Sequence, residues 1–335
     1  MKGRMIKGAL FCMLLGGLVA CGGNKEAGSK AEEKKVYELK ISTTQAESSV
    51  IVQGLQELAK EVDEKTSGGL KITVYPSSSL GVEEDIIDQA VQGINVAVLT
   101  DAGRMSDYVP EIGIFNMAYF VDNYDEALKV METETFKGWL NELTEHNLRV
   151  LTFNYYDGAR SFMGHKEAKV PADLKGIVVR TPGAAPYVES MKAMGVTPYN
   201  IAWSEVYNGI QTKSIDGCEV QYTSAVSSHI YEVCKVVNKT EHINLLNCLV
   251  TGEGWFSKLP EEYKTILLET ANETAYNNGK KIESMQAEME KTLVDNGMKI
   301  VEVDKEAFKK SVEKAYDALK YTDLRKKIYE EIGKN

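Results

Sequence analysis

Hydrophobic and polar residues follow alternating strand-like and helix-like patterns along most of this chain. After residue 36, one stretch alternates in the manner of a half-buried strand, and apolar residues then recur at helical spacing. The order that this pattern predicts is a strand over 37–42, a helix around 55–62, a strand over 70–75, a helix around 87–94 and a buried strand over 96–99. Such alternation predicts a parallel sheet with helices on both faces.

The same pattern continues through the middle of the chain. It predicts a helix over 125–146, strands over 149–154 and 174–180, helices over 187–194 and 204–213, and a short strand over 217–220. Gly158 follows the predicted strand over 149–154 and precedes a new series of predicted strands and helices, so we place the start of a second α/β domain close to it.

A single long helix is predicted near the C-terminus. It begins at Pro260, ends at Asn296 and Gly297, and carries apolar residues at helical spacing throughout. About 35 residues at 1.5 Å each give roughly 50 Å, which exceeds the width of one domain of this size. We therefore expect this helix to cross both domains.

The N-terminus has the pattern of a lipoprotein signal. Lys2, Arg4 and Lys7 precede an apolar run over 9–18. This run leads into the sequence LVACG over 18–22, in which Cys21 is the fourth residue. The run is about half of the roughly 20 residues needed to span a membrane. We predict a signal peptide over 1–20, lipidation at Cys21 and a flexible tether over 21–35, which makes the protein extracytoplasmic and lipid-anchored.

Charge and cysteine content exclude several classes of protein. The net charge of -10 becomes more negative once the basic signal is removed, so nucleic acid is not an expected partner. Cys218, Cys234 and Cys248 remain in the mature chain. They form either one disulfide with a free thiol or three reduced thiols, and neither arrangement indicates catalysis.

Motifs for catalysis are missing from the sequence. It contains no G-x-S-x-G, no H-E-x-x-H and no P-loop, and its four histidines fall on different predicted elements. We predict a protein that is not an enzyme and that uses neither a metal nor a cofactor.

Arginine is the informative residue type. The chain has 39 basic residues, of which only six are Arg, so lysine serves for ordinary surface charge. Arg180 ends a predicted strand, and Arg160 follows shortly after a strand predicted to end at Tyr156. The carboxyl ends of parallel strands line the ligand crevice of an α/β sheet, and the guanidinium fork matches a carboxylate. Both arginines are candidates for binding an anionic ligand, with a surface salt bridge as the alternative for each.

Aromatic residues cluster in sequence around these arginines. Tyr156 and Trp203 are candidate walls for a polar ligand with a carbon skeleton. Packing is the alternative for each, because 17 tyrosines are spread over the whole chain.

Several stretches together resemble one known family. They are VYPSSSLG over 74–81, GAR over 158–160, PADLKGIVVR over 171–180, SEVY over 204–207 and IDGCE over 215–219. From about residue 39 onward the chain resembles the DctP-type substrate-binding proteins of tripartite ATP-independent periplasmic (TRAP) transporters.

The resemblance implies a two-domain periplasmic-binding-protein-like α/β fold, with a long helix crossing both domains and hinge closure over the ligand. The boundaries expected are 36–157 plus 246–285 for the first domain and 158–245 plus 286–335 for the second. It also implies that Arg180 pairs with the substrate carboxylate and that Arg160 adds a second contact. The positions where relatives contact the polar end of their ligands correspond to Thr44, Gln45, Glu83 and Asp101.

One departure from the family concerns the site itself. Many relatives have Glu-Asn-Pro where this chain has Glu219, Val220 and Gln221. In those relatives the Asn contacts the ligand carboxylate, and a valine cannot donate that hydrogen bond. Either Gln221 or Tyr222 compensates, or the ligand is shorter, more apolar or differently placed.

The function that follows is capture of a small organic carboxylate, such as a sugar acid, keto acid or dicarboxylate, for the small and large membrane subunits of a TRAP transporter. A monomer is expected. The alternative is a ligand-sensing lipoprotein that serves a signalling receptor.

Overall fold

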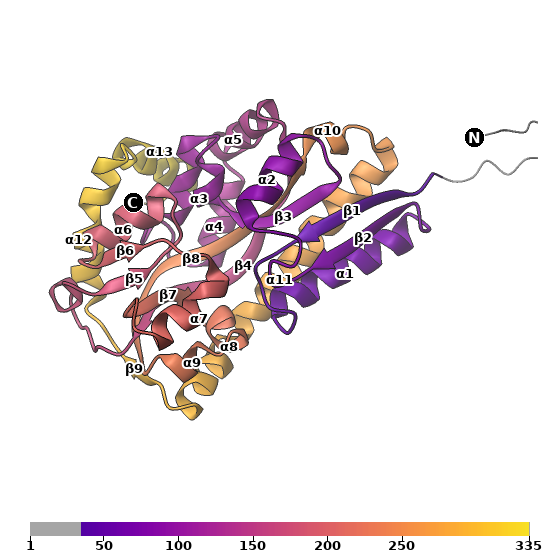
Figure 1. Ribbon diagram of the computed structural model, residues 1–335. Coiled ribbons are helices and arrows are strands. Elements are labelled where there is room, and N and C mark those ends of the chain that lie inside the picture. The colour runs from indigo at the N-terminus through magenta and orange to yellow at the C-terminus, as the bar shows by residue number, and fades with distance from the viewer. Residues whose placement is uncertain (1–34, 335) are drawn as a thin grey trace, which may run out of the picture. The chain divides into compact units, whose positions relative to one another are not determined.

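The computed structural model describes residues 35–334 of the chain (Figure 1). The strands are β1 (Tyr37–Ser42), β2 (Leu70–Tyr75), β3 (Val96–Asp101), β4 (Leu148–Gly164), β5 (Val178–Arg180), β6 (Thr197–Tyr199), β7 (Gly217–Gln221), β8 (Val236–Gly252) and β9 (Lys299–Val301). The helices of the first half are α1 (Val50–Lys65), α2 (Glu83–Val91), α3 (Ala102–Met105), η1 (Pro110–Asn116), α4 (Tyr124–Met131) and α5 (Glu134–Glu145). Those of the second half are η2 (Pro171–Leu174), α6 (Ala185–Ala193), α7 (Trp203–Gln211), α8 (Tyr222–Ser227), α9 (Ile230–Val233), α10 (Glu253–Phe256), α11 (Glu261–Asp295), α12 (Lys305–Ala318) and α13 (Thr322–Ile332).

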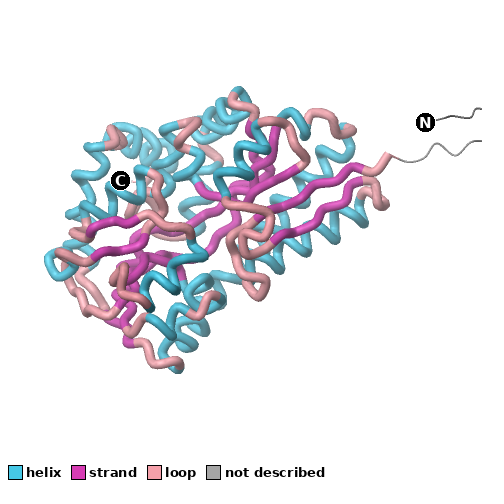
Figure 2. Tube along the Cα trace, in the orientation of Figure 1, coloured by secondary structure: helices cyan, strands magenta, loops and turns pink. Residues whose placement is uncertain are grey.

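All the strands of residues 35–334 belong to one sheet in the order β2-β1-β3-β8-β4-β7-β5-β6, with β9 paired to β8. The two ends of this sheet are parallel. In its centre β8 is antiparallel to β3 and to β4, and β4 is antiparallel to β7, while β9 is parallel to β8. Figure 2 shows the strands running through the middle with helices on either side. We call the end with β2, β1 and β3 the first lobe and the end with β7, β5 and β6 the second lobe. The predicted α/β fold is confirmed, and β4 and β8 connect its two lobes.

The first lobe forms as its sequence pattern predicts. In α1, the side chain of Ser49 caps the helix by accepting a hydrogen bond of 3.2 Å from the backbone N–H of Val52. The apolar stripe of this helix, with Leu55, Leu58 and Val62, is fully buried. The strands alternate with helices as expected, so the carboxyl ends of β1 and β3 lie at the same edge of the sheet.

Three predicted elements differ from the structure. The strand expected over 174–180 is present only as β5, Val178–Arg180, because Leu174 ends the 3-10 helix η2. The helix expected over 125–146 is two helices, because Thr133 starts α5 as an N-cap that accepts from the backbone of Phe136 at 3.1 Å. The strand expected to stop before Arg160 runs on to Gly164 as β4. Gly158, with φ of +99°, lies at a register shift of β4 against β8. The glycine at which the sequence predicts the start of a second domain is therefore part of a bulge within a continuous strand. Arg160 is therefore a strand residue.

The long helix α11 has its predicted bounds, with Pro260 as N-cap and Asn296 as C-cap. It contacts α1 in the first lobe, β4 in the centre and α8 in the second lobe. Figure 1 shows it side by side with α1. The predicted helix across both lobes is confirmed. No helix within residues 35–334 combines the length and the apolar character that a membrane span requires.

The core has two hydrophobic clusters. The larger cluster lies between the sheet and the helices packed on it, and its members run from Leu39 of β1 to Ile328 of α13. The smaller cluster lies in the second lobe and contains residues of β7, of the helices after it and of the end of α11. The domain boundaries expected from the sequence remain a prediction, because the sheet is continuous through both lobes. The predicted signal peptide, Cys21 and the predicted tether up to residue 34 lie outside the described residues.

Candidate ligand-binding site

Arg180 is a buried arginine, and no carboxylate within residues 35–334 forms an ion pair with it. It ends β5, where it lies beside Cys218 of β7, and only 6% of the residue is exposed. Its Nε donates to the backbone carbonyl of Ile201 at 3.1 Å, and its guanidinium lies 5.4 Å from the ring of Trp203. Burial, with the neighbouring charge of Arg160, lowers the pKa of Arg180 to about 10. A buried cation in this state is stabilised by any anion that enters its surroundings.

Arg160 lines the same region but its charge is already neutralised. Its Nη2 donates to Glu219 Oε1 at 2.8 Å, its Nε donates to the other carboxylate oxygen, and its Nη1 donates to Gln221 Oε1 at 3.2 Å. Burial alone would raise the pKa of Glu219, but Arg160 and His242 outweigh it and lower this pKa to about 2. The predicted second ligand contact is therefore part of a buried ion pair.

The first lobe contributes an acidic cluster around Arg104. This guanidinium is shared by three carboxylates, with Asp101 at 3.0 Å, Glu83 at 3.1 Å and Glu84 at 3.0 Å. Asp101 ends β3 and also caps α3, since it accepts from the Arg104 backbone N–H at 3.2 Å. Burial raises the pKa of Glu83. Three carboxylates around one cation leave acceptor oxygens for hydrogen-bond donors of a ligand.

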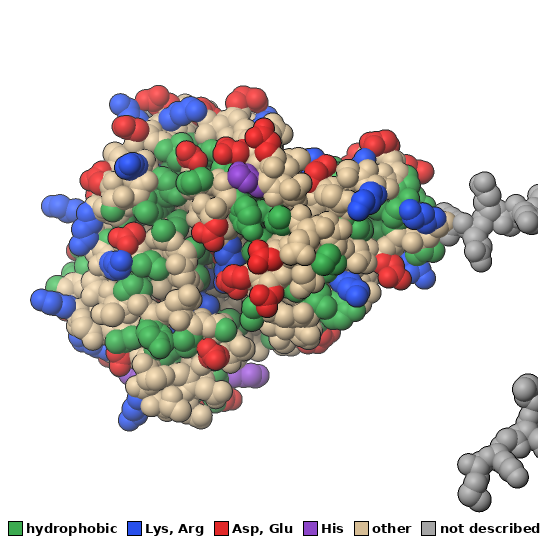
Figure 3. Space-filling view, turned by 45° about the horizontal axis from the view of Figure 1, so that its top comes forward, with side chains coloured by type: hydrophobic (Ala, Val, Ile, Leu, Met, Phe, Trp, Pro, Cys, Tyr) green, Lys and Arg blue, Asp and Glu red, His purple; other side chains and the backbone are tan. Residues whose placement is uncertain are grey.

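These groups line one cavity between the lobes. The sequence-predicted residues that line it are Thr44, Gln45, Glu83, Asp101, Arg160, Arg180, Trp203, Val220 and Gln221. The structure adds Thr43, Leu99, Arg104, Pro182, Ser224, Leu245 and Asn247. Figure 3 shows basic side chains deep in a hollow of this face, with acidic side chains along one rim. The arrangement has a cationic end in the second lobe and an acceptor-rich end in the first.

The cavity is small. About 60 Å³ of it is open to the centre of a water molecule, whereas pockets for larger organic ligands measure roughly 300–1,000 Å³. A space of this size holds a few waters or a compact ligand. The lobes are therefore close together over the site in this conformation.

Two predicted residues do not line this cavity. Tyr156 donates to Asn244 Oδ1 at 3.1 Å, and Tyr222 donates to Glu290 at 3.0 Å. Both border a separate cavity of about 470 Å³ that also contains Lys239 and Gln286. Tyr222 is thus not placed to replace the asparagine of relatives, and the amide of Gln221 is engaged by protein groups.

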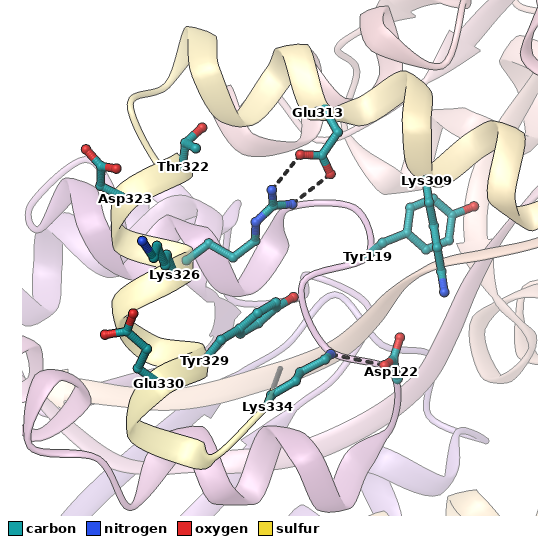
Figure 4. Close-up of a pocket in the computed structure, with 11 residues that line it drawn as sticks. Tyr119, Asp122, Lys309, Glu313, Thr322, Asp323, Lys326, Tyr329, Glu330 and Lys334 are labelled. Carbon is teal, nitrogen blue, oxygen red and sulfur yellow. Dashed lines mark hydrogen bonds and ion pairs between the residues drawn. The ribbon is translucent and has the colours of Figure 1, made fainter.

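A larger cavity of about 710 Å³ lies elsewhere, between the loop at Tyr119 and helices α12 and α13 (Figure 4). Its arginine, Arg325, donates to both oxygens of Glu313 at 3.0 and 2.6 Å, and Lys334 pairs with Asp122 at 3.0 Å. Arg325 and Lys334 have partners already, and Lys326 is exposed to solvent, so this cavity offers a desolvated carboxylate less than the one at Arg180 does.

The described part of the chain contains no side-chain cluster suited to metal binding or to thiol chemistry. Within residues 35–334, no group of three or more His, Cys, Asp and Glu side chains is arranged to hold a metal ion. Cys218, Cys234 and Cys248 are free and buried, which corresponds to the second of the two thiol arrangements considered from the sequence.

Comparison with known proteins gives one consistent result. Residues 41–323 match the family described as bacterial extracellular solute-binding protein, family 7 (DctP). A solute-binding protein of Chromohalobacter salexigens is 31% identical over 267 residues, which is 79% of each chain.

Solved structures of similar proteins agree with this match. A TRAP periplasmic solute-binding protein from Ochrobacterium anthropi, described with bound L-fuconate, has a TM-score of 0.86 at 26% identity, covering 89% of this chain and 99% of its own. One from Actinobacillus succinogenes, described with bound L-galactonate, has a TM-score of 0.84 at 27% identity, covering 88% and 99%.

Proposed function

Because the chain belongs to bacterial extracellular solute-binding protein family 7, we propose that it captures a small organic carboxylate between its two lobes and delivers it to the membrane subunits of a TRAP transporter. The observation that carries this proposal is Arg180, a buried guanidinium that lines the interlobe cavity and has no carboxylate partner in the part of the chain that the structure describes. A ligand carboxylate supplies the missing charge and accepts two parallel hydrogen bonds from the fork. Binding and release need no chemical change in the ligand.

A sugar acid is the ligand class that suits both ends of the cavity. Its carboxylate is placed at Arg180, and its hydroxyl groups donate to the carboxylates of Glu83 and Asp101, which lie in the first lobe. Two proteins of this fold are described with bound L-fuconate and L-galactonate, which are acids of this class. Keto acids and dicarboxylates offer fewer donors to the acidic cluster.

The cellular setting belongs to the same proposal. Cys21 follows a signal-like segment, so the mature protein is held at the outer face of a membrane by its lipid, as a monomer. From there the closed, loaded form docks on the small and large membrane subunits.

The test is a thermal-shift screen of the mature chain against four- to six-carbon aldonates. Each aldonate is paired with its alditol, which has the same carbon number and a hydroxymethyl group in place of the carboxylate. A ligand at 100 times its dissociation constant stabilises by about 2.7 kcal/mol, which is a clear shift in melting temperature. Stabilisation by an aldonate without stabilisation by its alditol supports the proposal. Equal shifts for both, or no shift in the whole panel, would contradict it.

A further inference from the structure

Asp157 is a fully buried carboxylate at the centre of a polar network. It lies on β4, and its exposure is 0%. Its Oδ1 accepts from the Thr223 hydroxyl at 2.5 Å, and its Oδ2 accepts from Gln45 Nε2 at 2.9 Å and from the Gln221 side chain. Asn247 also donates to Oδ2, at 3.5 Å. These donors are all neutral, and they come from both lobes and from the connecting strand β8.

Gln45 is the member of this network that belongs to the first lobe. It follows β1 in a segment where the Ser77 backbone N–H donates to its carbonyl at 2.8 Å. Its side chain reaches the second half of the site, because Nε2 donates to Asp157 and Oε1 accepts from the Ser224 hydroxyl of α8 at 3.3 Å. Both polar atoms of this side chain are therefore occupied by groups beyond the first lobe.

Gln221 has an equally full set of partners in the second lobe. Its Nε2 donates to Asp157 and to Ser224 Oγ at 2.9 Å, and its Oε1 accepts from Arg160 at 3.2 Å. The amide is thereby fixed in one orientation, and it holds Ser224 where the hydroxyl meets Gln45. The cavity that contains Arg180 also contains Gln45, Gln221 and Ser224, so the network lies directly beside the ligand position.

We infer that Gln45, Asp157, Gln221 and Ser224 form an interlobe latch, in which Gln45 acts as a positioning residue that holds the lobes closed over the ligand. Its part in binding is to slow release, whereas direct recognition belongs to Arg180 and the acidic cluster. Where it concerns ligand release, this inference rests on the proposed function. The latch itself is a property of the lobes, and it can be measured without a ligand.

In the inferred opening, Gln45 moves with the first lobe away from Asp157 of the connecting strand β4 and from Ser224 of the second lobe. A hydrogen bond to an ionised group contributes about 1.5–3 kcal/mol in folded proteins, which corresponds to a factor of roughly ten to a hundred in an equilibrium. Loss of the latch therefore shifts the balance toward the open form by about this factor. The association step, in which the lobes begin apart, is affected little.

The variant that tests this is Gln45→Ala, with Gln56→Ala as its matched control. Gln56 lies on the exposed side of α1 in the same lobe, and its amide contacts Glu47 at 3.1 Å on the surface. The first measurement uses spin labels on cysteines introduced by Lys60→Cys in α1 and Glu205→Cys in α7, both exposed positions on different lobes. Cys218, Cys234 and Cys248 are buried and stay unlabelled in the folded protein.

In the absence of ligand, Gln45→Ala is expected to shift the distance distribution between the labels toward longer distances, and Gln56→Ala is not. Identical distributions for Gln45→Ala and the parent would overturn the latch. This outcome is independent of what the protein binds.

The second measurement is stopped-flow kinetics with L-galactonate. Gln45→Ala is expected to raise the dissociation rate about tenfold or more and to leave the association rate within about twofold. A slower association with unchanged dissociation would show Gln45 to be a recognition residue and would also overturn the inference. If L-galactonate binds to no variant, the proposed ligand class fails, and the label distances alone decide the latch.

Discussion

Arg160 donates to both carboxylate oxygens of Glu219, and the two side chains form a buried ion pair beside the interlobe cavity. Arg180 lines the same cavity, and none of the described carboxylates pairs with it. The two arginines therefore have different energetic roles, since one contributes to the fold and the other is available to an anion. Substitutions at the two positions separate these roles.

Arg180→Ala should weaken binding of an aldonate by about 2–5 kcal/mol, because the ligand carboxylate loses its partner in a desolvated site. Isothermal titration calorimetry measures this change. Arg149→Ala is the control, since Arg149 pairs with Glu253 at 2.6 Å away from the cavity. Affinity close to that of the parent in Arg180→Ala would refute the role of this residue. Arg180→Lys keeps the charge but loses the fork, so its affinity should fall between the two.

Arg160→Met should lower the free energy of unfolding by about 3–5 kcal/mol, because it leaves Glu219 charged and buried. Denaturant unfolding without ligand measures this effect. The double variant Arg160→Met with Glu219→Gln should recover most of the loss, since it removes the uncompensated charge. If the two single effects simply added in the double variant, the side chains would not be coupled, and the pair would have no special role.

The pH dependence of stability should contain a contribution from Asp157. Burial raises the pKa of this carboxyl to about 6, above the value of about 3.9 for an unfolded chain. Between these values the folded protein holds a proton that the unfolded chain has lost, so folding is stabilised as pH falls from about 6 toward 4. As pH falls through this window, the melting temperature of the parent should therefore rise relative to that of Asp157→Asn. A constant difference from pH 7.5 to 4.5 would contradict the raised pKa.

Val220→Asn tests the departure from the family at the site. Val220 is buried and lines the cavity, so an amide there should cost about 1–3 kcal/mol of stability while its hydrogen bonds are unmade. A ligand carboxylate gives the amide a partner, so an aldonate should stabilise this variant more than the parent. Val237→Asn is the control, because Val237 is buried in the second lobe away from the cavity. Equal ligand-induced shifts in both variants would mean that the ligand does not reach position 220.

The regular part of the fold was predictable because hydropathy and secondary structure agree there. Strand β8 was not predicted, since its buried residues include Asn238, Thr240, His242 and Asn244 among apolar ones. Each of these polar side chains has a specific partner, such as the backbone carbonyl of Val121 for Asn244. A pattern of apolar residues cannot reveal a strand that is buried through such contacts.

The lining of the interlobe cavity, which is the candidate site, was predictable where backbone position determines side-chain position. Arg180 ends a strand that the sequence indicates clearly, and its placement followed from that. Arg104 was missed because it lies on a helix of only four residues. The residues around it in the sequence do not distinguish it from an arginine on the surface. Tyr156 faces a different cavity because neighbouring residues of a strand, here Tyr156 and Asp157 of β4, point to opposite faces of the sheet. Tyr222 borders that same cavity from the start of helix α8, where strand alternation no longer applies.

The strand order also has a consequence for how the chain acquires its structure during synthesis. β8 lies between β3 and β4, so the first lobe lacks a central strand until residues 236–252 have been made. Domains of many proteins fold one after another as they emerge from the ribosome, but here the N-terminal half must wait for β8, which begins 135 residues after β3 ends at Asp101 (236 against 101). Until then the edges of β3 and β4 stay unpaired, and a chaperone that covers exposed strand edges would protect this precursor from aggregation.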